Sequence, residues 1–231
     1  MSSKKRLILV VLGSLVVIFI IVNIVIITSN SGFNNLTRSI EIPDKQDLWS
    51  AGNTIHDGDH FLYNLTIENR NKSVDNYLIN IIFRNSQNYW NTEFTISNDS
   101  KSAKIYSQLS KSNLLMKEKQ LKNQKYIDIV ESSILQIKDI TREPKYLAIG
   151  AKWDSINTGI TTIPIKITSK EYLFSKVGKL ETFVLSYKIK DRSSNMWISK
   201  NLPLPVKAEI YNEVDKLKYK YDIIRLNRDI K

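Results

Sequence analysis

The chain has 231 residues, of which 42% are hydrophobic, and it carries a formal net charge of +11. This length allows one membrane anchor and one domain with its own core, and the apolar content excludes wholesale disorder. Because the sequence contains no cysteine, it excludes disulfides, thiolate zinc sites and cysteine nucleophiles.

The first predicted element is a membrane anchor at Leu7–Ile27, a run of 21 residues without a charge. At 1.5 Å per residue it spans about 31 Å, the thickness of a bilayer's hydrocarbon core. We expect an uncleaved signal anchor; a cleaved signal peptide and a buried soluble helix are the alternatives. Lys4, Lys5 and Arg6 precede the run, so the positive-inside rule places the N-terminus in the cytoplasm. The predicted organisation of this single-pass cell-membrane protein is a cytoplasmic stub (1–6), the anchor (7–27), a linker (28–39) and an extracytoplasmic domain (40–231).

Four Asn-x-Ser/Thr sequences lie on the predicted outer side of the membrane, where N-glycosylation is possible. They begin at Asn35, Asn64, Asn71 and Asn98. The remaining positive charge is spread along the chain, which predicts a solvated basic surface. Attraction to anionic headgroups, cell-surface polymers or nucleic acid is the alternative, although no nucleic-acid partner is expected.

The outer domain is dominated by apolar residues that alternate with polar ones, as they do in half-buried strands. Residues 61–69, 77–84 and 90–98 predict an antiparallel meander with asparagine-rich turns. Residues 161–169, 183–189, 197–199, 206–211 and 217–223 repeat the pattern. Pro203 and Pro205 cannot donate ladder hydrogen bonds, so LPLP is expected to form a stiff corner between two strands.

Between these two regions the period changes to that of a helix, predicted over Tyr126–Lys138. Ala103–Asn123 is expected to form a strand and then a turn, and Trp153–Gly159 a loop. The predicted fold class is α+β, a curved, mainly antiparallel sheet with one packed helix following the N-terminal transmembrane helix. A β-sandwich is the alternative, but it has no place for a core helix of this length.

The C-terminal third resembles the closing hairpins of lipoprotein-carrier-like (LolA/LolB-type) half-barrels. The residues that carry the resemblance are Gly178–Phe183, Trp197-Ile198, Leu204–Glu209 and Lys216-Leu217. The chain also looks like membrane-anchored archaeal proteins of unknown function with an LPLPVKAE-like stretch. It departs from the carrier pattern at Lys179-Leu180, where Thr-Phe is usual, and it lacks the lipobox cysteine of bacterial lipid anchors.

The resemblance implies that the concave face of the sheet holds an apolar or lipid-like ligand. The bulky residues expected to line that face are Phe61, Tyr63, Phe83, Phe183, Tyr187 and Tyr219. The helix would form the remaining wall, and its displacement would admit the ligand. Alternatively, the helix and these aromatic residues fill one another's space.

Sequence signatures of catalysis and of cofactor binding are absent, so neither an enzyme nor a cofactor is expected. His56 and His60 flank Asp57-Gly58-Asp59, and this spacing suits a metal only on a helix. Gly58 and the strand that follows favour a turn instead, with no metal bound. Two functions therefore remain: binding of an apolar or lipid-like ligand, and a non-catalytic module that contacts other envelope proteins. An undetected enzyme is the third possibility.

Overall fold

The computed structural model describes residues 48–69, 71–117, 123–159, 161–212 and 216–228, which all fall within one compact unit. The predicted stub, anchor and linker, together with Asn35, lie outside the described residues. Within the described ranges, no helix is both long and apolar enough to cross a bilayer.

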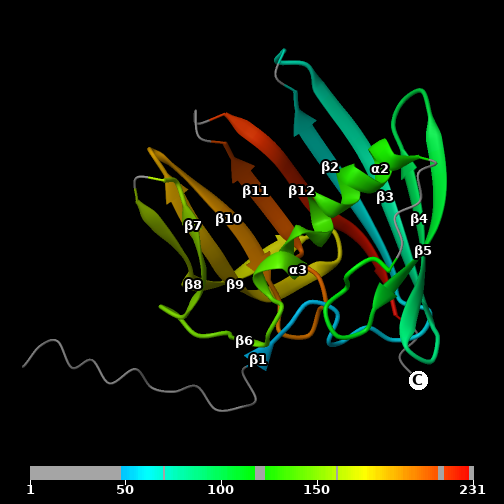
Figure 1. The fold of residues 1–231 in the computed structure, drawn as a ribbon, viewed down its shortest axis with the longest axis horizontal. Helices are drawn as coiled ribbons and strands as arrows, with labels where there is room; N and C mark the ends of the chain where they lie inside the picture. Colours follow the sequence, from blue (N-terminus) through cyan, green and yellow to red (C-terminus); the bar gives the residue numbers. More distant parts are fainter. Residues whose placement is uncertain (1–47, 70, 118–122, 160, 213–215, 229–231) are drawn as a thin grey trace, which may run out of the picture. The chain divides into compact units, whose positions relative to one another are not determined.

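Ten strands of the described chain form a single antiparallel sheet (Figure 1). Its order is β5-β4-β3-β2-β12-β11-β10-β9-β8-β7, so the last strand lies between the first long strand and β11. Two further short strands, β1 (Leu48–Trp49) and β6 (Lys145–Tyr146), pair with each other. The ten strands are β2 (His60–Glu68), β3 (Val74–Asn85), β4 (Tyr89–Ser97), β5 (Ser102–Ser110), β7 (Lys152–Asn157), β8 (Thr162–Ser175), β9 (Gly178–Ile189), β10 (Arg192–Ile198), β11 (Lys207–Tyr211) and β12 (Leu217–Asn227).

The α+β class and the curved sheet are confirmed, and the β-sandwich alternative is wrong because the ten strands belong to one sheet. The strand and turn expected over Ala103–Asn123 begin with β5 as predicted. The loop expected over Trp153–Gly159 is wrong, because β7 occupies most of it and pairs with β8. A bulge between Lys152 and Asp154 interrupts the alternation there and leaves Trp153 buried. The turn after β7 is present, with the Gly159 N–H donating to Asn157 Oδ1 at 2.8 Å.

The predicted single helix is divided into α2 (Gln124–Glu131), a 3-10 turn η2 (Ile134–Gln136) and α3 (Ile137–Ile140). The break falls at Ser132 and Ser133, whose hydroxyls donate to the carbonyls of Asp128 (2.6 Å) and Ile129 (2.5 Å). Such side-chain bonds compete with the helix ladder for its last carbonyls, so the α-helix ends there.

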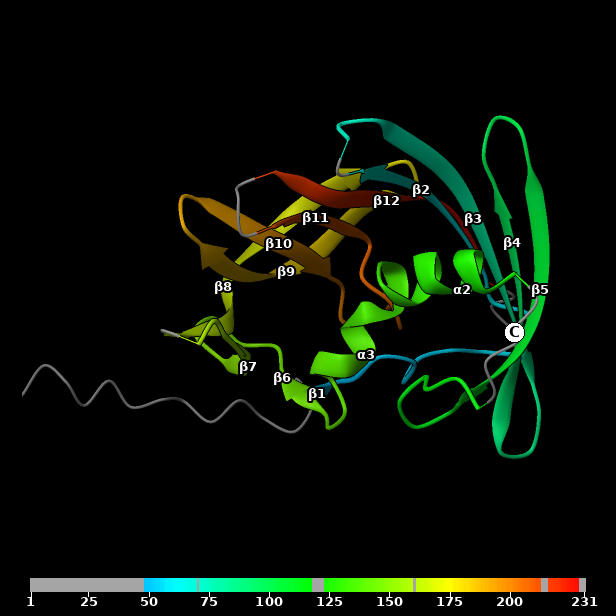
Figure 2. The same ribbon diagram turned by 45° about the horizontal axis from the view of Figure 1, so that its top comes forward.

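The helical segment lies on the concave side of the sheet, which curls around it (Figure 2). Its buried residues Ile127, Val130, Ile134, Leu135 and Ile137 join the same apolar cluster as the concave faces of the strands. Edge-to-face ring pairs occur within that cluster, between Phe61 and Phe83 and between Tyr63 and Tyr221, with centroids 5.9 and 5.6 Å apart. The helical segment and the strand aromatics therefore belong to one apolar core.

The LPLP stretch forms the expected corner between β10 and β11, and Leu202–Val206 is buried. Its carbonyls accept hydrogen bonds from distant parts of the chain. Trp49 Nε1 donates to the Leu202 carbonyl (2.9 Å), and the Tyr63 hydroxyl donates to the Pro205 carbonyl (3.2 Å). The corner thus fastens the beginning of the domain to its C-terminal hairpins.

Candidate functional site

The six aromatic residues predicted to line a ligand space are brought together on the concave face. Five are buried in the core cluster and Tyr187 is half-buried beside it. The Tyr219 hydroxyl donates to Gln136 Oε1 in the helical segment. Burial raises the pKa of the Tyr63 and Tyr219 phenols well above the ordinary tyrosine value, so both remain protonated donors. Their role in ligand binding stays a prediction.

The His56–His60 segment is a turn, as its sequence predicts, with Gly58 at φ 86°. The buried Asp59 carboxylate accepts the His56 N–H at 2.9 Å. It also forms an ion pair with Arg228, with 3.3 Å between Nε and Oδ2. The described residues contain no cluster of three or more His, Cys, Asp or Glu side chains suited to a metal ion. The ion pair between Asp59 and Arg228 joins the start of β2 to the end of β12.

The described sequons differ in how accessible their asparagines are. Asn64 is exposed in the middle of β2. Asn71 is exposed, but its Oδ1 accepts the Ser73 N–H at 3.1 Å, and half-buried Asn98 accepts the Lys101 N–H at 3.0 Å. Asn64 is therefore the described sequon with the most open side chain, and glycosylation stays a prediction.

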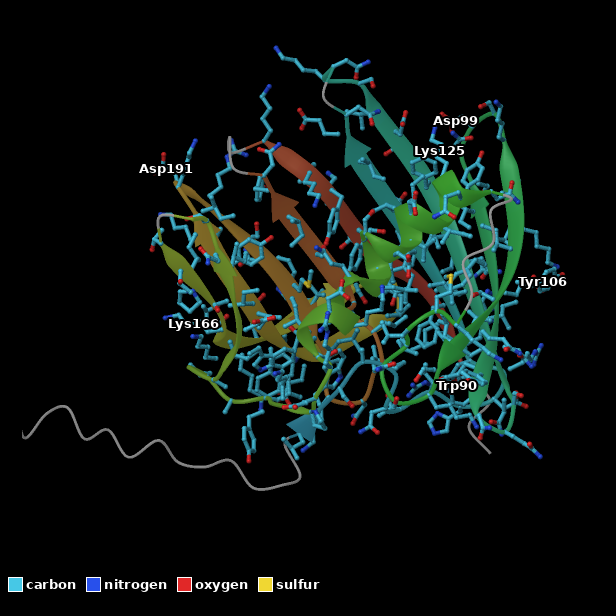
Figure 3. All side chains as sticks on the ribbon, viewed as in Figure 1. Trp90, Asp99, Tyr106, Lys125, Lys166 and Asp191 are labelled. Atoms are coloured by element: carbon cyan, nitrogen blue, oxygen red, sulfur yellow. The ribbon has the colours of Figure 1, made fainter. Side chains whose placement is uncertain are left out.

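A groove of about 450 Å³ lies on β3–β5, and none of the predicted ligand residues lines it. Most of its lining residues are of polar or charged types, among them Arg84, Asn91, Glu93 and Lys117, with Ile82 and Tyr106 beside them. Figure 3 shows Tyr106 projecting from β5 away from α2. The groove is thus on the outer side of the sheet. Glu93 is held there in an ion pair with Lys104 at 2.8 Å.

The most unusual surface is on the β8–β9 hairpin, where a bulge changes which residues face outward. The register shifts between Ile167 and Ser169, and Thr168 is the extra residue. Its hydroxyl lies 3.0 Å from Ser186 Oγ. Beyond the bulge, the cross-strand pairs on one face are Lys170–Phe183, Tyr172–Glu181 and Phe174–Lys179. We name Lys170, Tyr172, Phe174, Lys179 and Glu181 the hairpin crest.

The opposite face of this hairpin is held against the body of the domain. Leu173, Val177 and Leu180 pack against the core cluster, and Trp197 Nε1 donates to Glu171 Oε1 at 2.5 Å. In both ribbon views the yellow hairpin crosses β11 and β12 on the side away from the helix (Figures 1 and 2). Since one face of the hairpin is fastened to the convex side of the sheet, the crest points to solvent.

The crest combines exposed aromatic rings with cations. Phe174 is 79% exposed and Tyr172 59% exposed. The Lys179 ammonium lies 4.1 Å from the Tyr172 ring centroid and 5.8 Å from that of Phe174. Lys170 pairs with Glu181 at 3.1 Å. Sequence reasoning missed this surface, although Tyr172 and Phe174 alternate with shorter residues directly before the Gly178 turn.

Asp222, on the convex side of β12, has a raised pKa, chiefly because burial removes water from its carboxylate. Because the pKa of Asp222 is higher in the folded state than in the unfolded state, its protonated form favours folding, fully so at a pH below the unfolded pKa. This contribution is lost as the pH rises through the folded pKa. We therefore expect Asp222→Asn to be more stable than the natural chain at neutral pH, by about 0.5 kcal/mol or less. The gain should vanish in acid. Thermal unfolding of both chains from neutral pH to about pH 3.5 checks this, and a less stable variant at neutral pH would contradict it.

Comparisons with known proteins assign no family to this chain. No protein-family model matches the chain, and no curated protein matches it significantly. An exported protein with a YmcC-like fold from Bacteroides fragilis is 10% identical, with a TM-score of 0.42, over 78% of this chain and 99% of its own. A lipoprotein from Parabacteroides distasonis is 9% identical, with a TM-score of 0.43, over the same shares.

A MucA/MucB complex from Pseudomonas aeruginosa provides a third similar chain. It is 13% identical, with a TM-score of 0.33, over 73% of this chain and 51% of that one. This chain therefore matches about half of that protein. All three TM-scores lie below 0.5, so these likenesses assign neither a family nor a partner. The expected archaeal relationship and membrane anchor stay predictions.

Proposed function

We propose that the protein is a membrane-tethered, extracytoplasmic interaction module that binds an acidic surface of another envelope protein through its hairpin crest. The observation that carries the proposal is the exposure of Phe174 and Tyr172 on a fastened, basic hairpin. No catalytic step and no cofactor form part of the proposed function.

The packing of the domain supports an outward-facing role. The concave face is occupied by the helical segment, whose apolar residues share one core with the strands. Leu173, Val177 and Leu180 of the hairpin pack half-buried against that core, whereas Phe174 and Tyr172 are largely exposed and contribute little to it. Aromatic residues in a preorganised surface lose little entropy on binding and often dominate the energy of an interface.

The charge of the hairpin indicates which partner surface fits. Residues 162–189 contain five lysines and two glutamates. Both glutamates are engaged, Glu171 with Trp197 and Glu181 with Lys170. Complementary charge speeds encounter and excludes wrong partners, so an acidic surface is the expected counterpart.

Photo-crosslinking from the crest tests the proposal. We would introduce a photo-reactive phenylalanine analogue at Phe174 of the full chain in its own membrane, with the same analogue at Tyr106 as the matched control. We expect one discrete protein adduct from position 174 whose crosslinked peptide is rich in Asp and Glu. Lys179→Glu should reduce its yield about tenfold, as loss of a close charge pair does. Adducts only to lipid, or equal adducts from both positions, would overturn the proposal.

The carrier function is the second candidate, and it requires the helical segment, which lies on the concave side of the sheet, to move aside for a ligand (Figure 2). Its break at Ser132-Ser133 offers a point where α2 could move away from the sheet. This function requires a ligand in contact with residues such as Phe61 and Phe83. Mass spectrometry of organic extracts from the purified chain tests it. One stoichiometric lipid that resists exchange into detergent would support the carrier.

A further inference from the structure

We infer that residues Tyr146–Ala151, here named the foot loop, form the surface by which the domain rests on an anionic lipid bilayer. This inference rests on the membrane tether of the proposed function. It concerns a different surface from the hairpin crest and a different partner, the lipid itself.

The foot loop exposes apolar side chains that the core does not use. Its sequence, YLAIGA, has no charged residue, and Ile149 is 67% exposed at its tip. Tyr146 is also exposed, whereas Leu147 between them is buried. Single exposed apolar residues are common on protein surfaces, so the inference rests on the loop's flanking charges and on its place beside β1.

Hydrogen bonds hold the loop in this shape. The Gly150 N–H donates to the Ile167 carbonyl (2.8 Å), and the Ala151 N–H donates to the Ala148 carbonyl (2.9 Å). Gly150 has φ 89°, a conformation that side chains rarely adopt, and it permits the tight turn after Ile149. Ile149 is therefore presented outward by a defined backbone.

The flanking charges suit anionic headgroups. Lys145 and Lys152 border the loop on either side, and Arg142 and the exposed Glu143 lie before it, so these four side chains carry a net charge of +2. Arg142 and Lys152 are exposed and Lys145 is half-buried. An apolar tip with cations at its base matches the bilayer interface, where apolar groups enter the headgroup region and cations meet lipid phosphates.

The loop lies beside the first described residues of the chain, which distinguishes it from other exposed apolar residues. β1 begins the described chain, and its Leu48 pairs with Tyr146 of the loop. In the sequence, twenty residues separate Ile27, the end of the predicted anchor, from Leu48. A short connection keeps the domain close to the bilayer. A weak contact between the bilayer and residues near Leu48 is therefore formed for much of the time.

The cysteine-free sequence allows a direct test by single-cysteine labelling. We would place an environment-sensitive nitrobenzoxadiazole (NBD) dye at Ile149→Cys, and at Phe174→Cys as the control, in the full chain reconstituted into vesicles. One set contains phosphatidylcholine alone, and the other an equal mixture with phosphatidylglycerol. In the mixture we expect the dye at position 149 to brighten several-fold, shift to the blue and be quenched by nitroxide lipids. The dye at position 174 should stay in water.

A charge-reversed variant and a flotation assay complete the test. Arg142→Glu with Lys145→Glu and Lys152→Glu should return the dye at position 149 to its aqueous spectrum, while circular dichroism confirms the fold. Suppose that the chain floats with vesicles after carbonate extraction, but the dye at position 149 stays in water or behaves like the dye at position 174. This result overturns the proposed role of the foot loop and leaves the membrane tether supported. A chain that does not float overturns both.

Discussion

Replacing Phe61 by alanine should lower the free energy of unfolding by about 3–5 kcal/mol. Phe61 has no exposed surface and packs edge-to-face on Phe83 in the apolar core. Its removal leaves a cavity that the surrounding strands cannot fill. The measurement is denaturant unfolding of the full chain in detergent micelles, followed by tryptophan fluorescence.

Phe174→Ala is the matched control, because it makes the same chemical change at a position that is 79% exposed. Its effect should stay within about 0.5 kcal/mol. If Phe61→Ala were tolerated equally well, the residue would adjoin space that a ligand can occupy. That outcome would favour the carrier over the interaction module.

Replacing Arg228 by alanine should cost about 3–5 kcal/mol, the usual penalty for leaving one partner of a buried ion pair without the other. Its counterpart Asp59 has a side chain that is 1% exposed. The Arg228 guanidinium also donates to the carbonyls of Asn201 (2.9 Å) and Thr54 (2.7 Å). The end of β12 is thereby joined to the turn before β2 and to the segment that leads into LPLP.

Urea unfolding of Arg228→Ala beside Arg225→Ala, an exposed arginine of the same strand, measures this effect. Adding Asp59→Asn to the Arg228→Ala chain should recover part of the loss, since no buried charge then remains unpaired. Equal stability of the two single arginine variants would show that the pair contributes little.

Alternation along the sequence predicted most strands because one face of the sheet is wet, and each such strand repeats its pattern every two residues. The strand segments that the sequence pattern did not predict lie next to bulges. The extra residue at Trp153 concealed β7, and the one at Thr168 concealed the second half of β8. A bulge inserts one extra residue that no particular side chain marks. The alternation of apolar and polar residues is therefore shifted by one position where the strand continues.

The sequence pattern also did not predict the break in the helix or the exposure of the hairpin crest. Apolar spacing predicted the position of the helix but not its break, because Ser132 and Ser133 can either point to solvent or bond to a carbonyl. Tyr172 and Phe174 suggest a core strand by composition. Their exposure follows from the hairpin crossing the convex face, which depends on contacts between segments far apart in the sequence. Sheet order is likewise absent from local patterns.

The position of β12 in the sheet has a consequence for how the protein is made. During synthesis, β2–β5 are made well before β12 and β11 directly before it, yet β2 and β11 are joined only through β12. Until β12 is made, β2 and β11 each have an unpaired edge beside an apolar face. Such edges can pair with strands of other chains. The two halves of the sheet therefore cannot join until β12 has been made. We expect slow folding dominated by distant contacts, and a messenger truncated before codon 217 should yield aggregates in place of a smaller domain.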